Sequence, residues 1–239
     1  MQTRAVLFDL GNTLVSYYRV DEFPTILRRC LRACLAELRP GSSTEPDEEL
    51  LNRALALNQE ASDHAVRPLP DRLITLFPEY EHDPLVLERL SAAFLQPIFA
   101  TASLDPDALP VLDALRSRGQ SLAIVSNTPW GSAAPAWRDE LDRHGLLAAV
   151  DAAVFCTETG FRKPHPAPIR RALEALHVSA RDALFVGDDV RWDVLGARAA
   201  GVRPLLLLPA SADDPSPDDV PVINQLRDVL KYVAAPSAS

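Results

Sequence analysis

Short apolar runs that alternate with helix-like segments are the feature that most limits how this chain can fold. The runs span residues 4–8, 121–126, 183–187 and 203–208, with a weaker one at 151–156. Helical periodicity marks the segments 106–119, 133–145, 165–177 and 191–201. Strands that alternate with helices favour an α/β fold in which helices cover both faces of a parallel sheet.

Glycines mark the ends of three of these helix-like segments. Gly119, Gly145 and Gly201 each close one segment, and glycine is common just past the C-terminus of a helix. The next apolar run begins soon after two of these glycines, so the segments end where a turn back to the sheet is needed. In sheets of this kind a ligand binds at the carboxyl ends of the strands.

A helical stretch interrupts this alternation soon after the first strand. We expect its helices at residues 22–38, 46–64, 69–77 and 83–100. The sequence therefore predicts an α/β core domain of residues 1–16 and 101–239 and an inserted α-helical domain of residues 17–100. The last two elements that we predict are a loop rich in proline and aspartate at 211–221 and a short helix at 222–233 that packs against the core.

The composition narrows the class of protein. Hydrophobic residues make up 47% and charged residues 24% of the chain, which is typical of a soluble globular protein. The net charge of −9 and the lack of a dense Lys/Arg run argue against nucleic-acid binding. No apolar run approaches the ~20 residues that span a membrane. Three cysteines and no secretory signal favour a reducing compartment, so we expect a cytoplasmic monomer or homodimer.

Polar residues gather after the apolar runs, in four places along the chain. They are Asp9 and Thr13, then Ser126 and Asn127, then Lys163, and finally Asp188, Asp189 and Asp193. A single strand-terminal aspartate often only caps the next helix. Four such groups, each after an apolar run or before a helix, indicate an active site at one edge of the sheet.

These motifs resemble, in order, those of the haloacid dehalogenase-like superfamily, in the branch with a helical cap inserted after the first strand. The resemblance covers nearly the whole core, whereas the insert matches only in position and helical character. It implies a Rossmann-like core with a cap, and a Mg²⁺-dependent phosphatase that acts on a small phosphorylated metabolite. We expect specificity to come from the insert, with Tyr17, Tyr18, Arg19 and Arg67 as candidates to face the site.

Phosphoryl transfer needs a nucleophile, charge neutralisation and positioning. Asp9 can attack and form an aspartyl-phosphate. Asp188 can help to hold Mg²⁺, which prefers oxygen ligands, and Asp189 or Asp193 could complete the shell directly or through water.

The resemblance implies roles for four more positions. The backbone carbonyl of Gly11 would join Asp9 and Asp188 around the metal. Lys163 would pair with Asp9 and with the phosphoryl oxygens. Ser126 and the backbone of Asn127 would donate hydrogen bonds to the same oxygens.

One position departs from the family pattern. Most phosphatases of the family carry a second aspartate two residues after the nucleophile, to protonate the leaving group and then activate water, and this chain has Gly11 there. Asn12 replaces a common glycine, and asparagine tolerates unusual backbone angles. Two alternatives therefore stay open: a slow or non-hydrolytic member that mainly binds a phosphorylated ligand, and a haloacid dehalogenase, which needs no metal.

Overall fold

The computed structural model describes residues 3–41, 45–58, 62–208 and 219–233. Its centre is a six-stranded parallel sheet with the strand order β5-β4-β1-β6-β7-β8. The strands are β1 (Ala5–Phe8), β4 (Ser121–Ser126), β5 (Ala152–Phe155), β6 (Ala183–Gly187), β7 (Arg203–Leu207) and β8 (Val222–Ile223). The α/β fold that the sequence predicts is confirmed, and five of the strands match the predicted runs.

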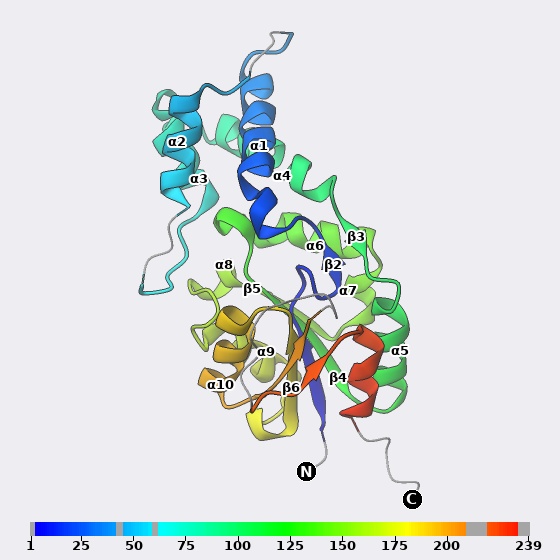
Figure 1. Cartoon of the computed structure of the whole chain (residues 1–239). Coiled ribbons are helices and arrows are strands. Elements are labelled where there is room, and N and C mark those ends of the chain that lie inside the picture. The colour runs from blue at the N-terminus through cyan, green and yellow to red at the C-terminus, as the bar shows by residue number, and fades with distance from the viewer. Residues whose placement is uncertain (1–2, 42–44, 59–61, 209–218, 234–239) are drawn as a thin grey trace, which may run out of the picture.

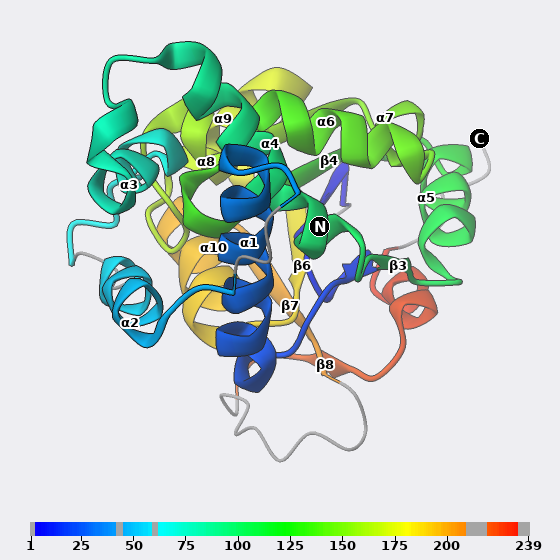
Figure 2. The ribbon, with the colours of Figure 1, turned by 90° about the horizontal axis from the view of Figure 1, so that it is seen from above.

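Side chains of β1 alternate between the two faces of the sheet, as the period of a strand requires. Val6 and Phe8 belong to one buried cluster, and Ala5 and Leu7 belong to another. Helices cover both faces, which explains why β1 is apolar throughout. The first cluster includes residues of α5 (Ala108–Ser117), α6 (Ala134–Arg143) and α7 (Leu146–Ala149), and the second includes residues of α9 (Ala167–Leu176) and α10 (Leu195–Ala200). Figure 2 shows α5 and α10 on opposite sides of the sheet.

The three glycines predicted to end helices adopt left-handed backbone angles. Their φ angles are 80° at Gly119, 71° at Gly145 and 77° at Gly201. Residues with a Cβ rarely take these angles, so glycine allows the chain to turn sharply from a helix toward the next element. This part of the prediction is confirmed.

The predicted last helix at 222–233 is wrong in its first half. Val222 and Ile223 form β8 instead, and they pair in parallel with Leu206 and Leu207 of β7. A six-residue 3-10 helix, η6 (Leu226–Lys231), follows. Pairing with β7 gives the backbone groups of these two residues hydrogen-bond partners at the edge of the sheet. Most of the predicted loop at 211–221 lies outside the described residues.

Two other predicted helices differ in length or type. The helix predicted at 46–64 is α2 (Glu48–Leu57), with Asp47 as its N-cap, and residues 59–61 lie outside the described ranges. The helix predicted at 191–201 begins as a π-helical turn, η5 (Val190–Val194), before α10 continues it. Such turns are frequent at functional sites.

Residues 17–102 contain no strand in their described part, and we refer to this segment as the helical insert. Its helices are α1 (Phe23–Leu38), α2, α3 (Leu69–Leu76) and α4 (Pro84–Phe99), with the 3-10 turns η1 (Val20–Glu22) and η2 (Pro78–Tyr80). The chain enters through β2 (Val15–Ser16) and returns through β3 (Ser103–Leu104), and these two form an antiparallel ribbon. Figure 1 shows α1 to α4 beyond the carboxyl edge of the sheet.

The described residues include no helix with the length and apolar character needed to cross a lipid bilayer.

Trp130, in the 3-10 turn η3 (Pro129–Gly131) after β4, joins the core to the helical insert. It is 2% exposed, its ring centroid lies 4.9 Å from that of Phe94, and the Arg72 guanidinium lies 5.4 Å from it. A second contact is an isolated antiparallel bridge between Ala65 and Phe161. The insert is therefore packed against the core at two loops, as well as tethered by the β2–β3 ribbon.

We expect Trp130→Ala to lower the free energy of unfolding by about 3–5 kcal/mol, because it removes a buried ring from this contact. Chemical denaturation measures the loss, and Trp130→Phe, which keeps an aromatic ring, should lose clearly less. A loss below about 1 kcal/mol would contradict this packing role, since surface substitutions have effects of that size.

Candidate active site

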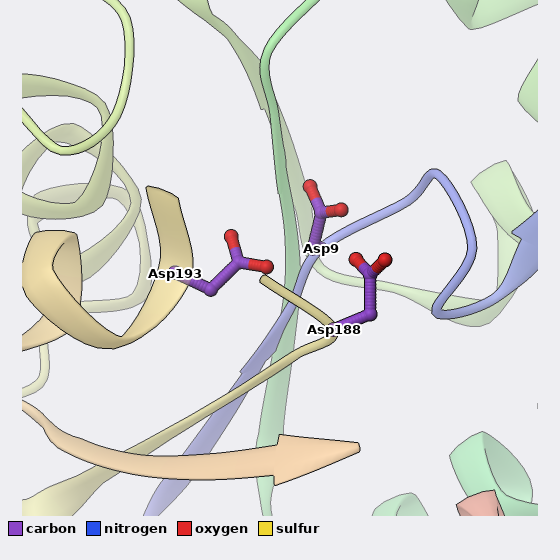
Figure 3. A group of neighbouring side chains, drawn as sticks. All are labelled: Asp9, Asp188 and Asp193. Atoms are coloured by element: carbon purple, nitrogen blue, oxygen red, sulfur yellow. The ribbon is translucent and has the colours of Figure 1, made fainter. Parts of the chain in front are cut away.

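Three carboxylates from two distant parts of the sequence point into one space at the carboxyl edge of the sheet (Figure 3). Asp9 follows β1, Asp188 follows β6, and Asp193 lies in the π-helical turn η5. One oxygen of each carboxylate lies within 4.8 Å of the others. Adjacent parallel strands end at the same edge, so β1 and β6 bring Asp9 and Asp188 together.

A buried lysine neutralises part of this negative charge. Lys163 is 1% exposed, and its Nζ donates to Asp9 Oδ1 at 2.5 Å and to Asp193 Oδ1 at 2.7 Å. The same Nζ donates to the carbonyl oxygen of Val125 on β4, at 3.0 Å. All three protons of the ammonium group therefore have acceptors, which a charge this deeply buried requires.

The side chain of Asn127 fixes the backbone of Lys163. Asn127 Nδ2 donates to the Lys163 carbonyl at 3.1 Å, and Asn127 Oδ1 accepts from the Lys163 amide at 2.8 Å. Ser126, at the end of β4, is 5% exposed and lies beside them. The predicted residues Ser126, Asn127 and Lys163 are thus neighbours.

Gly187 is needed because Asp193 lies against it. A Cβ at Gly187 would come closer than 3.0 Å to the Asp193 carboxyl group. Asp193 Oδ2 also accepts from the backbone amide of Asp189 at 3.1 Å. The Asp189 side chain caps η5 instead, since its Oδ1 accepts from the Trp192 amide at 2.8 Å. Of the two aspartates that the sequence left open, Asp193 is therefore the one inside the cluster.

Burial and mutual repulsion change the acidity of the cluster. Burial raises the pKa of Asp9 to about 7; Lys163 opposes this rise and Asp193 adds to it. Burial, then the charges of Asp9 and Asp193, raise the pKa of Asp188 to about 8. Burial alone would lower the pKa of Lys163, but the carboxylates of Asp193 and Asp9 raise it above its ordinary value, so the lysine stays charged. With three carboxylates and one lysine, the cluster has an excess of negative charge when all its carboxylates are ionised.

For the metal-free protein we expect the free energy of unfolding to fall as the pH rises from about 4 to about 8. Folded Asp9 and Asp188 keep their protons to about pH 7 and 8, whereas the unfolded chain releases them near 3.8. The folded state binds more protons in this window, so raising the pH favours unfolding. Thermal melts at several pH values measure the slope.

Asp188→Asn is the matched variant for this slope, which should become shallower because one titrating carboxyl group is gone. Addition of Mg²⁺ to the wild type near the upper end of the window should restore stability. An equal slope in wild type and variant would contradict the assignment to this cluster.

The turn after Asp9 tolerates its two unusual residues. Asn12 has a φ of 56°, and its amide donates to the Val15 carbonyl at 2.7 Å. The expectation that asparagine can hold this turn is confirmed. Gly11 does not have a positive φ, and a Cβ there would meet only Tyr17 Cδ2, at 3.9 Å, among the described side chains. A Cβ at position 11 would therefore fit.

The residues of the insert that the sequence singled out differ in their surroundings. Arg19 pairs with Asp21 and Arg67 pairs with Asp63, and all four side chains are largely exposed. Tyr17 is half-buried, and its hydroxyl oxygen is enclosed. Tyr18 packs against Phe23, with 6.3 Å between ring centroids.

The fold and the cluster define an α/β enzyme whose polar groups meet at the carboxyl edge of its sheet. The family model of haloacid dehalogenase-like hydrolases matches residues 3–201, and the chain belongs to this family of hydrolases.

Two curated relatives extend over most of the chain. Glyceraldehyde 3-phosphate phosphatase of Methanopyrus kandleri is 29% identical over 237 residues, which cover 96% of this chain and 97% of that protein. Phosphoglycolate phosphatase of Cereibacter sphaeroides is 31% identical over 205 residues, which cover 83% and 82%. The crystal structure of a 2-haloacid dehalogenase from Pseudomonas syringae is similar with a TM-score of 0.69 at 24% identity, covering 96% and 97%, a likeness of fold alone.

Proposed function

We propose that this protein is a Mg²⁺-dependent phosphatase that hydrolyses a small phosphorylated metabolite through an aspartyl-phosphate at Asp9. The observation that carries the proposal is a buried carboxylate, Asp9, which contacts a buried ammonium group and lies beside a second acidic group, Asp188. The two curated relatives, both phosphatases by name, support the same reaction class.

The residues of the cluster fit a magnesium ion. Asp9, Asp188 and Asp193 offer oxygen atoms within 4.8 Å of one another, and Mg²⁺ prefers such hard ligands. The raised pKa values of Asp9 and Asp188 indicate that a further cation is needed to keep both ionised. Asp9, Asp188 and the carbonyl of Gly11 would hold the ion, with Asp193 near it. When bound, the ion would neutralise charge on the nucleophile and on the phosphoryl group.

In the first chemical step, a carboxylate oxygen of Asp9 attacks phosphorus, and the bond from phosphorus to the ester oxygen breaks. The leaving group departs with the bonding electrons and takes a proton. In the second step, water attacks the aspartyl-phosphate and releases inorganic phosphate, which regenerates the Asp9 carboxylate. Lys163 donates to one oxygen of Asp9, which fixes the orientation of the carboxylate for the attack.

The remaining groups would position the phosphoryl oxygens. Ser126 and the backbone amide of Asn127 lie at the end of β4 and would donate hydrogen bonds to these oxygens. Lys163 would donate to them by exchanging one of the three acceptors that its ammonium group now has. Residues 17–100 would act as a cap domain that covers the substrate, moving about linkers near residues 15–20 and 98–105. Opening would have to separate Trp130 from Phe94.

Two rival functions make different predictions. A phospho-ligand-binding protein is favoured by Gly11, which supplies no acid for the leaving group. A haloacid dehalogenase is favoured only by likeness of fold, while the acidic Asp188 beside Asp9 favours a metal site.

Hydrolysis of p-nitrophenyl phosphate with Mg²⁺ and with excess EDTA separates these functions. We expect release of p-nitrophenol that requires the metal, because Asp9 and Asp188 repel an anionic ester unless their charge is neutralised. Full turnover in EDTA would contradict the role of the metal. No turnover with tight binding of the ester would favour the binding protein, and halide release from 2-chloropropionate would favour the dehalogenase.

A further inference from the structure

Tyr17 lies at the base of the helical insert and borders the nucleophile from the insert side. Its ring is the described side chain nearest to the vacant space at Gly11, two residues after Asp9. The ring is held in place by an edge-on contact with Trp137, at 5.7 Å between centroids. Trp137 is in turn fixed by a hydrogen bond from its Nε1 to Ser132 Oγ, at 2.8 Å. Packing against Trp137 therefore holds the Tyr17 ring in place.

The hydroxyl group of Tyr17 has no hydrogen-bond partner among the described residues, although its oxygen is shielded from solvent. A buried polar atom left in this state costs free energy, so a hydrogen-bond partner is expected. Burial, then the negative charges of Glu140 and Asp9, raise the pKa of Tyr17 far above its ordinary value. The group therefore remains a neutral O–H donor at physiological pH.

The buried groups around Asp9 limit where a substrate can lie. Lys163 and Asp193 contact each other on the core side of Asp9 and are almost completely buried. The organic part of a phosphate ester therefore has to lie away from these two residues, and the Tyr17 ring borders the space beside Gly11.

We propose that Tyr17 is a specificity-determining residue: its ring lines the space taken by the leaving group, and its hydroxyl donates a hydrogen bond to an oxygen of that group. The substrate class is thus a phosphate ester whose leaving group carries oxygen close to the ester bond. This inference rests on the proposed phosphatase function and adds to it the chemistry of the group that is released.

Glu140 offers a rival explanation for the hydroxyl. This residue is fully buried on α6, and its Oε1 contacts His144 Nε2 at 3.2 Å. Its Oε2 lies 3.0 Å from Arg143 but lacks hydrogen-bond geometry, so it is a second candidate acceptor for the Tyr17 hydroxyl. In that case the tyrosine would be structural, and the substrate would not sense its hydroxyl.

The test compares glycerol 3-phosphate with propyl phosphate, which share a three-carbon chain and differ in two hydroxyl groups. Each is measured as a competitor of p-nitrophenyl phosphate hydrolysis, so neither needs to be turned over. We expect the wild type to bind glycerol 3-phosphate more tightly. In Tyr17→Phe this preference should shrink about 3- to 10-fold, the range of one hydrogen bond, with propyl phosphate changed by less than about 2-fold. Tyr232→Phe, at an exposed tyrosine that ends η6, is the matched control.

Several outcomes would overturn the inference. The wild type could show no preference, or Tyr17→Phe could weaken both competitors equally. Alternatively, Tyr17→Phe and Glu140→Gln could have strongly non-additive effects on the free energy of unfolding while the preference stays unchanged, which would assign the hydroxyl to Glu140. Failure of the wild type to hydrolyse any phosphate ester would instead contradict the proposed function itself.

Discussion

Replacing Asp9 with asparagine is expected to reduce turnover of p-nitrophenyl phosphate to below about 1% of the wild-type rate, because the amide has the size of the carboxylate but cannot act as the nucleophile. The fold should remain intact. Burial raises the pKa of Asp9, so a neutral amide is easier to bury at this position than the charged carboxylate. Steady-state kinetics and thermal melts of the same samples separate loss of chemistry from loss of structure.

Asp189→Asn is the matched control for this variant. Asp189 is also an aspartate at the carboxyl edge of the sheet, but its side chain caps η5, and asparagine is an equally good capping residue. We expect this control to keep most of its activity. Turnover well above about 1% in Asp9→Asn would point to direct attack by water on phosphorus.

Replacing Gly11 with aspartate is expected to raise turnover on the order of 10²-fold for alkyl phosphates, and less for aryl phosphates. General acid catalysis contributes about 10²–10⁴-fold, and its value is greatest for a leaving group that departs poorly without a proton. The structure removes the main steric objection, because the nearest atom that a Cβ at Gly11 meets among the described residues is Tyr17 Cδ2, at 3.9 Å.

The slope of log rate against leaving-group pKa is the measurement for this variant. A steep slope in the wild type that flattens in Gly11→Asp would support the argument. Gly11→Asn is the control, since it adds the same bulk without an acid. Equal slopes in wild type and in a folded, metal-loaded Gly11→Asp would mean that another group, or the substrate itself, supplies the proton.

The sequence predicts the core of this molecule well, because its strands are buried on both faces. β4 and β6 coincide with the apolar runs at 121–126 and 183–187, since a strand with no solvent face shows as an uninterrupted apolar run. Because parallel strands share a carboxyl edge, the order of the motifs also placed Asp9 near Asp188. β8 was missed because two residues carry no readable period.

The contacts that depend on distant packing could not be predicted. The sequence left both Asp189 and Asp193 open, and the π-helical turn η5 turns Asp193 toward Lys163 and leaves Asp189 as the cap. Gly187 carried a signal that could have been read, since glycine within a strand often marks close approach of another group. Nothing in the sequence indicated that Trp130 would be buried against the insert.

The most direct test of the central claim is to look for the phosphoryl group on Asp9. Wild-type protein is mixed with Mg²⁺ and p-nitrophenyl phosphate, quenched in acid during turnover, digested with trypsin and analysed by mass spectrometry. The peptide of residues 5–19 contains Asp9 as its only carboxylate side chain. We predict that this peptide carries one phosphoryl group, that hydroxylamine removes it as it does an acyl phosphate, and that it is absent in Asp9→Asn. Rapid release of phosphate with no label on this peptide at any time of quenching would contradict the account.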